Sequence, residues 1–240
     1  MNFKKYILST TLIFGFLFTA TAQTTSEFFK KSDVFFSKYV KSGKVDYKSI
    51  KADDASLSEL IGMAEKITVT KGNQNEYQAF WINAYNLNVI KSVVENYPIK
   101  SPLNKAGFFD GIKHNVGGKK ITLNNMEHKM LRAVFPKESR FHFVLVCAGL
   151  GCPPIISKAY LPNTLETQLQ EQTEKALNDS NFVRINKNKV KLSQIFDWYK
   201  KDFTQGGKSL VEYVNQFRKE KLPENAKVGY YAYDWTLNQQ

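Results

Sequence analysis

Two cysteines and three histidines are the side chains of this sequence that are best suited to chemistry. Cys147 and Cys152 lie close together, and the histidines are His114, His128 and His142. A cysteine thiol acts as a nucleophile where a histidine takes its proton and a third polar group orients that histidine. A metal site needs three or four converging ligands, and Cys147, Cys152 and His128 match no standard zinc spacing. The sequence therefore favours thiol chemistry over a metal centre.

The apolar run that ends at Cys147 determines where its sulfur points. Residues 141–147 read FHFVLVC, and their length and composition predict a central β-strand that is covered on both faces. The small residues 148–151 follow as a tight loop, which would leave the Cys147 sulfur exposed. Side chains two positions apart share a face of a strand, so His142 would face away from Cys147. We therefore interpret His142 as a hydrogen-bonded core histidine.

His128 is the better partner for Cys147, because the short helix predicted around it is expected to pack against the strand. Asn83 and Asn86 lie three positions apart in a helix that is predicted to be buried. A buried amide is costly unless it is hydrogen-bonded, so these asparagines either tie the helix to neighbouring backbone or line a site. Asp234, near the end of the chain, is a speculative further member of the site.

Three states are open for the two cysteines: a disulfide that closes the loop, a free functional thiol at Cys147, or two inert thiols. The small residues between them make the approach that a disulfide requires feasible. No helix is predicted to start near Cys147, so no helix dipole would lower its thiol pKa. Both candidate histidines also precede Cys147, unlike the order in papain-like enzymes. These points count against a working thiol without deciding between the states.

Helical periodicity dominates the elements that would position these residues. The strongest prediction is a helix over 74–97, which is apolar most of the way round and should be buried. A hairpin is predicted around residues 116–121, and short strands at 182–186 and 189–192. Further helices are predicted at 24–40, 55–67, 124–134, 163–178, 193–203 and 208–219. We expect an α+β fold, a helix-rich single domain with a small β-sheet.

The first 22 residues have the three parts of a cleavable secretory signal peptide. Lys4 and Lys5 precede about thirteen apolar or small residues, and an A-x-A pattern ends at Ala22. The apolar stretch is shorter than the roughly 20 residues that span a bilayer, and no later segment is long enough. We expect cleavage after Ala22, a secreted or periplasmic protein, and one globular domain over residues 23–240.

The chain is basic, with 34 lysines and arginines against 22 acidic residues and a formal charge of +12. The cations are mostly lysines and are scattered, whereas nucleic-acid surfaces concentrate cations and interleave them with aromatic side chains. We therefore expect a solvated lysine coat and no nucleic-acid partner. An exported basic protein could also contact anionic components of the cell envelope.

Five motifs resemble the family called domain of unknown function 547. They are AFWINAYN at 79–86, LNNMEHKMLR at 123–132, RFHFVLVCAGLGCPPI at 140–155, KLSQIFDWYKKDF at 191–203 and YAYDWTLN at 231–238. The resemblance covers roughly residues 30–238. It implies recurring residues at Asn83, Asn86, His128 and Cys147, whereas plant members differ at Cys152. A disulfide is then not a requirement of the whole family, and the resemblance implies no established activity.

Two functions from different classes remain. In the first, the protein is a thiol-dependent hydrolase or an acyl or peptidyl transferase that needs no cofactor. Cys147 is its nucleophile, His128 is the general base, and Asn83 and Asn86 orient His128 or bind substrate. In the second, it is a non-catalytic envelope binding or scaffold protein in which the same residues form a buried network and the cysteines are oxidised. The sequence does not decide whether the protein is an enzyme.

Overall fold

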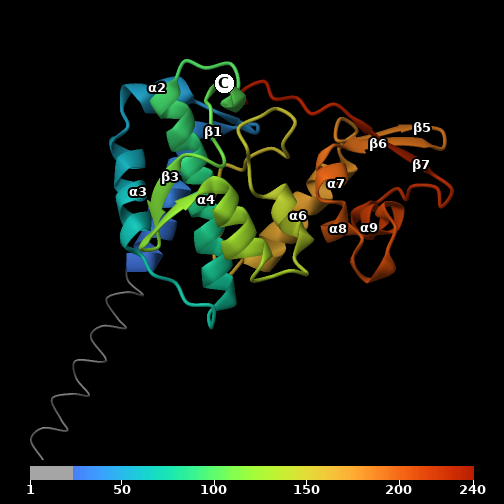
Figure 1. Ribbon diagram of the computed structural model, residues 1–240, viewed down its shortest axis with the longest axis horizontal. Helices are drawn as coiled ribbons and strands as arrows, with labels where there is room; N and C mark the ends of the chain where they lie inside the picture. The colour runs from blue at the N-terminus through green and yellow to red at the C-terminus, as the bar shows by residue number, and fades with distance from the viewer. Residues whose placement is uncertain (1–23) are drawn as a thin grey trace, which may run out of the picture.

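The computed structural model describes residues 24–240 (Figure 1). The predicted signal peptide over residues 1–22 lies outside the described residues. Helices outweigh three small sheets of two or three strands, so the predicted helix-rich α+β class is confirmed. No helix within residues 24–240 is both long enough and apolar enough to cross a membrane.

Helix α4 (Gln74–Asn96) is the central helix of the fold and confirms the strongest prediction from the sequence. The Asn73 side chain accepts a hydrogen bond from the Glu76 amide at 3.3 Å, and this cap begins the helix. Pro98 ends it, because helical backbone is disfavoured before a proline. Seventeen of its 23 residues are buried. Burial on all sides explains why its apolar positions cover more than one stripe.

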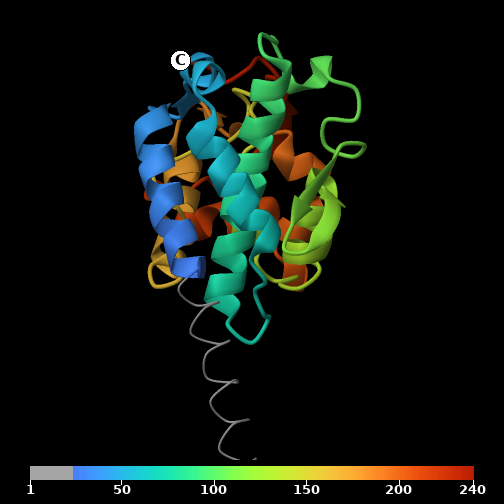
Figure 2. The same ribbon diagram turned by 90° about the vertical axis from the view of Figure 1, so that its left-hand side faces the viewer.

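The N-terminal helices pack against α4 as a layer. Residues 24–39 are helical, and α2 (Tyr47–Ala52) and α3 (Ala55–Lys66) follow. Both α2 and α3 contact α4, and the Phe28 ring lies 5.5 Å from the ring of Phe80 in α4, centroid to centroid. Figure 2 looks onto this layer and shows α3 running alongside α4. The predicted helices at 24–40 and 55–67 are confirmed.

Each of the three sheets is small. Two are hairpins, β1 (Val40–Lys41) with β2 (Lys44–Val45) and β3 (Lys113–Val116) with β4 (Lys119–Thr122). In the third sheet β5 (Val183–Asn186) pairs antiparallel with β6 (Lys189–Ser193), and β7 (Lys227–Tyr231) pairs parallel to β6. The three predicted strand regions outside 141–147 are confirmed. The sequence analysis missed β7, which lies with the third sheet at the far end of the molecule from α3 (Figure 1).

Residues 141–147 do not form the predicted strand. A 3₁₀ helix, η3 (Ser139–Phe143), occupies the first part of the run, and irregular backbone leads from it to Cys147. Phe141, Phe143 and Val144 are all buried, so this segment is covered on every side without a sheet. A short apolar run of this kind looks the same in sequence whether it forms a buried strand or a buried turn. Side chains do not alternate between two faces here, so the prediction that His142 faces away from Cys147 no longer holds.

The remaining helices are short, except for α6. They are η1 (Pro102–Asn104), α5 (Leu123–Asn125), the π-helical η2 (Met126–Arg132), α6 (Leu165–Asn178), α7 (Ile195–Trp198), α8 (Lys200–Phe203), η4 (Gln205–Gly207) and α9 (Leu210–Phe217). The predicted helix at 193–203 is split into α7 and α8 at Tyr199. The predicted helix at 124–134 is present, but most of it is wound as a π-helix.

The end of the chain returns to the loop between the two cysteines. The Leu150 amide donates to the Thr236 carbonyl at 2.8 Å, and the Gly151 amide donates to the Asp234 carbonyl at 2.7 Å. A Cβ atom on Gly151 would lie 2.8 Å from the Asp234 nitrogen, so this close approach requires glycine. The cysteine loop is thus held by backbone more than 80 residues later in the sequence.

Candidate functional site

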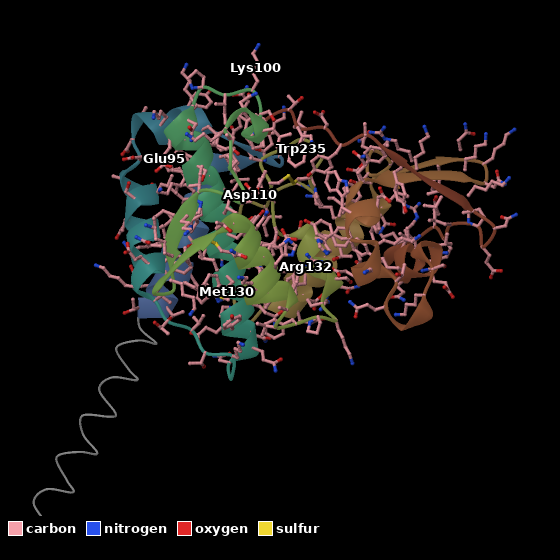
Figure 3. All side chains as sticks on the ribbon, in the orientation of Figure 1. Glu95, Lys100, Asp110, Met130, Arg132 and Trp235 are labelled. Carbon is pink, nitrogen blue, oxygen red and sulfur yellow. A yellow bond between two sulfur atoms is a disulfide. The ribbon has the colours of Figure 1, made fainter. Side chains whose placement is uncertain are left out.

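An open pocket of about 510 Å³ brings both cysteines together with His142. Its walls come from α4, the segment over residues 103–110, η2, α7 and the C-terminal segment. In Figure 3 the yellow disulfide lies next to Trp235, which also lines the pocket. The other lining side chains that matter for the chemistry are Tyr85, Glu127, Tyr199 and Tyr233.

Cys147 and Cys152 form a disulfide, which is one of the three states left open by the sequence. Cys152 is buried and Cys147 is more exposed. The Tyr233 hydroxyl lies 2.8 Å from each sulfur, and the Cys147 amide donates to the Cys152 sulfur at 2.9 Å. Since neither sulfur of a disulfide carries a proton, Tyr233 is the donor in both contacts. The disulfide is therefore part of a hydrogen-bonded wall of the pocket.

His142 is buried and hydrogen-bonded, as the sequence predicted, but it does not face away from Cys147. Its side chain is 3% exposed, and its ring stacks on Tyr199 with centroids 4.1 Å apart. Nε2 lies 2.8 Å from Oδ2 of Asp202 in α8. Because η3 is a helix and not a strand, His142 and Cys147 contribute to the same pocket.

Asp202 determines which nitrogen of His142 carries the proton. Burial raises the pKa of this carboxyl, but hydrogen bonds from His142 and Arg132 outweigh burial and lower the pKa to about 2. An ionised carboxylate only accepts hydrogen bonds, so Nε2 of His142 is the protonated nitrogen. Nδ1 then keeps its lone pair. Nδ1 is thus the ring nitrogen of His142 that Asp202 does not engage.

His128 lies elsewhere, although the sequence favoured it as the base. It lines a separate hollow with Lys201, and its Nδ1 contacts Arg132. The preceding residue, Glu127, lines the pocket of Cys147 instead. Neighbouring residues on a helix point in different directions, so only one of the two can face the pocket. The structure does not place His128 in one pocket with Cys147.

Glu127 is a pocket residue that the sequence analysis missed. It is buried, its Oε1 lies 3.6 Å from the Arg132 guanidinium, and within residues 24–240 that oxygen accepts no hydrogen bond. Burial and the Glu127 carboxylate raise the pKa of Tyr199, which keeps this phenol protonated.

Asn83 and Asn86 are buried and hydrogen-bonded to backbone from distant segments. The Asn83 amide donates to the Tyr160 carbonyl at 2.7 Å, and its oxygen accepts from the Tyr160 amide at 3.0 Å. Asn86 bonds the Val144 carbonyl and the Val146 amide in the same way, each at 2.9 Å. Neither asparagine lines the pocket. Asn86 instead fixes the backbone that leads directly to Cys147.

Asp202 and Tyr233 are also residues that the sequence analysis did not place in the site. Both belong to motifs quoted for the resemblance, at 191–203 and 231–238, and that is the signal that could have found them. Asp234 does not line the pocket; it is exposed, and its carboxylate accepts from the Thr236 amide at 2.9 Å. The described part of the chain contains no cluster of His, Cys, Asp or Glu side chains that could hold a metal ion.

Comparison with known proteins yields one match. Residues 69–177 match the model of a family described as "Protein of unknown function, DUF547". This range includes α4, η2, His142 and both cysteines, whereas Asp202 and Tyr233 lie outside it. The match is narrower than the range of roughly 30–238 that the motifs suggested. No curated protein and no solved structure matches the chain.

Proposed function

The chain belongs to the DUF547 family over residues 69–177, and we propose that it is a thiol-dependent hydrolase or acyl or peptidyl transferase. Its nucleophile is Cys147 in the reduced protein. One observation carries the proposal: Cys147 shares a pocket with His142, whose Nε2 is held by the ionised Asp202. A thiol, a base and a group that orients the base are the three parts such catalysis requires.

The reaction begins once a thiol reductant has opened the disulfide. Nδ1 of His142 takes the proton of the Cys147 thiol, and the Asp202 carboxylate stabilises the imidazolium that forms. The thiolate attacks the acyl carbon of the substrate, and the imidazolium returns its proton to the leaving group. The product is a thioester on Cys147. Water or a second nucleophile then attacks the thioester, with His142 again as the base.

The other candidate residues have supporting roles in this proposal. Asn86 positions the backbone before Cys147 through two hydrogen bonds, and Asn83 holds the backbone at Tyr160. His128 contacts Arg132, and Arg132 donates to Asp202 at 2.8 Å. His128 is therefore connected to the base, His142, through these two side chains. We assign the general base to His142 and leave His128 outside the reaction.

Acylation of the reduced protein tests this function. We expect p-nitrophenyl acetate to leave one acetyl group on Cys147, detected by mass spectrometry of the intact protein and its peptides. His142→Gln should slow acylation by about 100-fold, because a positioned base contributes about 10²–10⁴-fold. His128→Gln is the matched control and should acylate at nearly the normal rate. Equal loss in both variants, or no acetyl group on Cys147, would contradict the proposal.

The disulfide is the observation that favours the second candidate, a non-catalytic envelope binding or scaffold protein. In that function the sulfurs stay bonded and the pocket only holds a ligand. Acylation tests separate the two, since a binding protein should not form a thioester after reduction.

We also propose that the protein is exported, because the first 22 residues have the pattern of a signal peptide. A mature protein whose measured N-terminus is not Gln23 would contradict cleavage after Ala22.

A further inference from the structure

The two sulfurs of the disulfide have different surroundings. The Cys152 sulfur accepts a hydrogen bond from the Cys147 amide at 2.9 Å and lies 2.8 Å from the Tyr233 hydroxyl. Within residues 24–240 the Cys147 sulfur has a hydrogen-bond contact with Tyr233 alone. Cys147 is also the more exposed of the two residues. Cys147 is thus the more accessible of the two residues, and the Cys152 sulfur has one more hydrogen-bond donor.

These differences determine how the disulfide would react with a thiol. An attacking thiolate displaces one sulfur of a disulfide as a thiolate, and a leaving thiol of lower pKa leaves faster. Hydrogen bonds donated to a thiolate favour the charged form and lower the thiol pKa. Burial raises the pKa of Tyr233, so its hydroxyl remains a proton-bearing donor. Cys152 is therefore the better leaving group, and Cys147 is the sulfur that is attacked.

We propose that the oxidised pocket is a thiol–disulfide exchange site that accepts an external thiol at Cys147. The substrate thiolate attacks the Cys147 sulfur, the bond between Cys147 and Cys152 breaks, and Cys152 leaves as a thiolate. A mixed disulfide joins the substrate to Cys147. A second thiolate attacks the substrate sulfur and releases the substrate disulfide and the Cys147 thiolate. Two external thiols are thereby oxidised by two electrons, and the protein becomes the dithiol.

The pocket supports access by such a substrate. Both cysteines line an open pocket of about 510 Å³ that aromatic side chains also line. Trp198, which is 47% exposed, stacks near Trp235, and both rings line the pocket. A low-molecular-weight thiol and a cysteine in a peptide offer the same reacting group. The exchange does not require acyl transfer, but its product is the reduced protein from which the proposed acyl transfer begins.

Mapping of the mixed disulfide tests which sulfur is attacked. The oxidised protein is treated at neutral pH with N-acetylcysteine in one arm and with a peptide containing one cysteine in the other. N-ethylmaleimide then blocks the freed thiol, and the peptides are mapped by mass. We expect the external thiol on Cys147 and the maleimide on Cys152. The faster arm identifies the source of the thiol. Adducts on Cys152, or no faster reaction than in urea-unfolded protein, would overturn the proposal.

The role of Tyr233 gives a second, independent test. Tyr233→Phe removes the hydroxyl and keeps the ring, and we expect exchange to slow by about fivefold as the leaving group loses a donor. Tyr213→Phe is the matched control, because that hydroxyl bonds Ser139 and Tyr213 does not line the pocket. An unchanged or faster rate in Tyr233→Phe, with Tyr213→Phe normal, would contradict the proposal that Tyr233 donates to the leaving thiolate, whereas the mapping of adducts decides which sulfur leaves. Exchange without acylation would overturn only the proposed acyl transfer.

Discussion

Glu127 and His128 are adjacent in the sequence, yet their side chains line two different hollows. The sequence identified His128 as a reactive type of residue, but it contained no information on which side of the helix would face Cys147. The sequence predicts a strand over 141–147 that would turn His142 away from Cys147, whereas the run begins as a 3₁₀ helix. At the scale of single residues, the sequence therefore indicated reactive residue types, but it did not indicate that His142, and not His128, lines the same pocket as Cys147.

His114 shows how strongly burial acts on a single residue of this fold. It lies on β3, is 4% exposed, and within residues 24–240 its Nε2 has no hydrogen-bond partner. Burial and the nearby charge of Lys91 lower its pKa to about 4, although Glu95 acts in the opposite direction. Protonation of His114 is therefore disfavoured in the folded state.

This shift predicts a pH dependence of stability. Below about pH 6.5 the unfolded chain binds a proton at His114 that the folded chain does not bind until about pH 4. Stability should therefore be fully present above pH 6.5 and fall by about 3 kcal/mol as the pH drops to 4. In His114→Gln the free energy of unfolding should lack this fall between pH 6.5 and 4, as measured by urea unfolding at several pH values. Parallel curves for the two proteins would contradict the shift.

At the scale of elements, α4 does more than fill the core. Asn83 bonds the backbone of Tyr160, and Asn86 bonds the backbone of the 141–147 run, where the sequence predicted strand neighbours instead. The sequence analysis left this role open beside a role in the site. Periodicity predicts that a helix is buried, but it does not predict which distant backbone its amides will bond.

Asn86 and Asn88 form a matched pair for testing this role. Both are buried in α4, but within residues 24–240 Asn88 donates solely to its own helix, at the Ala84 carbonyl at 2.8 Å. Asn86→Ala leaves the Val144 carbonyl and the Val146 amide buried and unpaired, at about 1–3 kcal/mol for each group. We expect Asn86→Ala to lower the free energy of unfolding by about 2–4 kcal/mol and Asn88→Ala to lower it much less. Equal effects in urea unfolding would contradict the role of Asn86.

At the scale of the whole molecule, local patterns predicted most helices and the two larger hairpins, and long-range pairing was not predictable. Strand β7 pairs with β6 from more than 30 residues away, and the tail beyond it bonds the cysteine loop, as Leu150 and Gly151 show. These contacts join segments that are far apart in the sequence, and the periodicity within each segment does not indicate which other segment it pairs with. The pocket is built by such contacts, so the sequence could suggest its reactive residues but not its walls.

In the proposed reaction His142 activates the Cys147 thiol. The most direct measurement is the rate of alkylation of Cys147 by iodoacetamide as a function of pH in Cys152→Ser, which keeps Cys147 reduced. We predict a midpoint below the ordinary thiol pKa of about 8.5. Adding His142→Gln should move the midpoint back toward that value, whereas adding His128→Gln should not. A midpoint at or above about 8.5 that His142→Gln leaves unchanged would contradict the account.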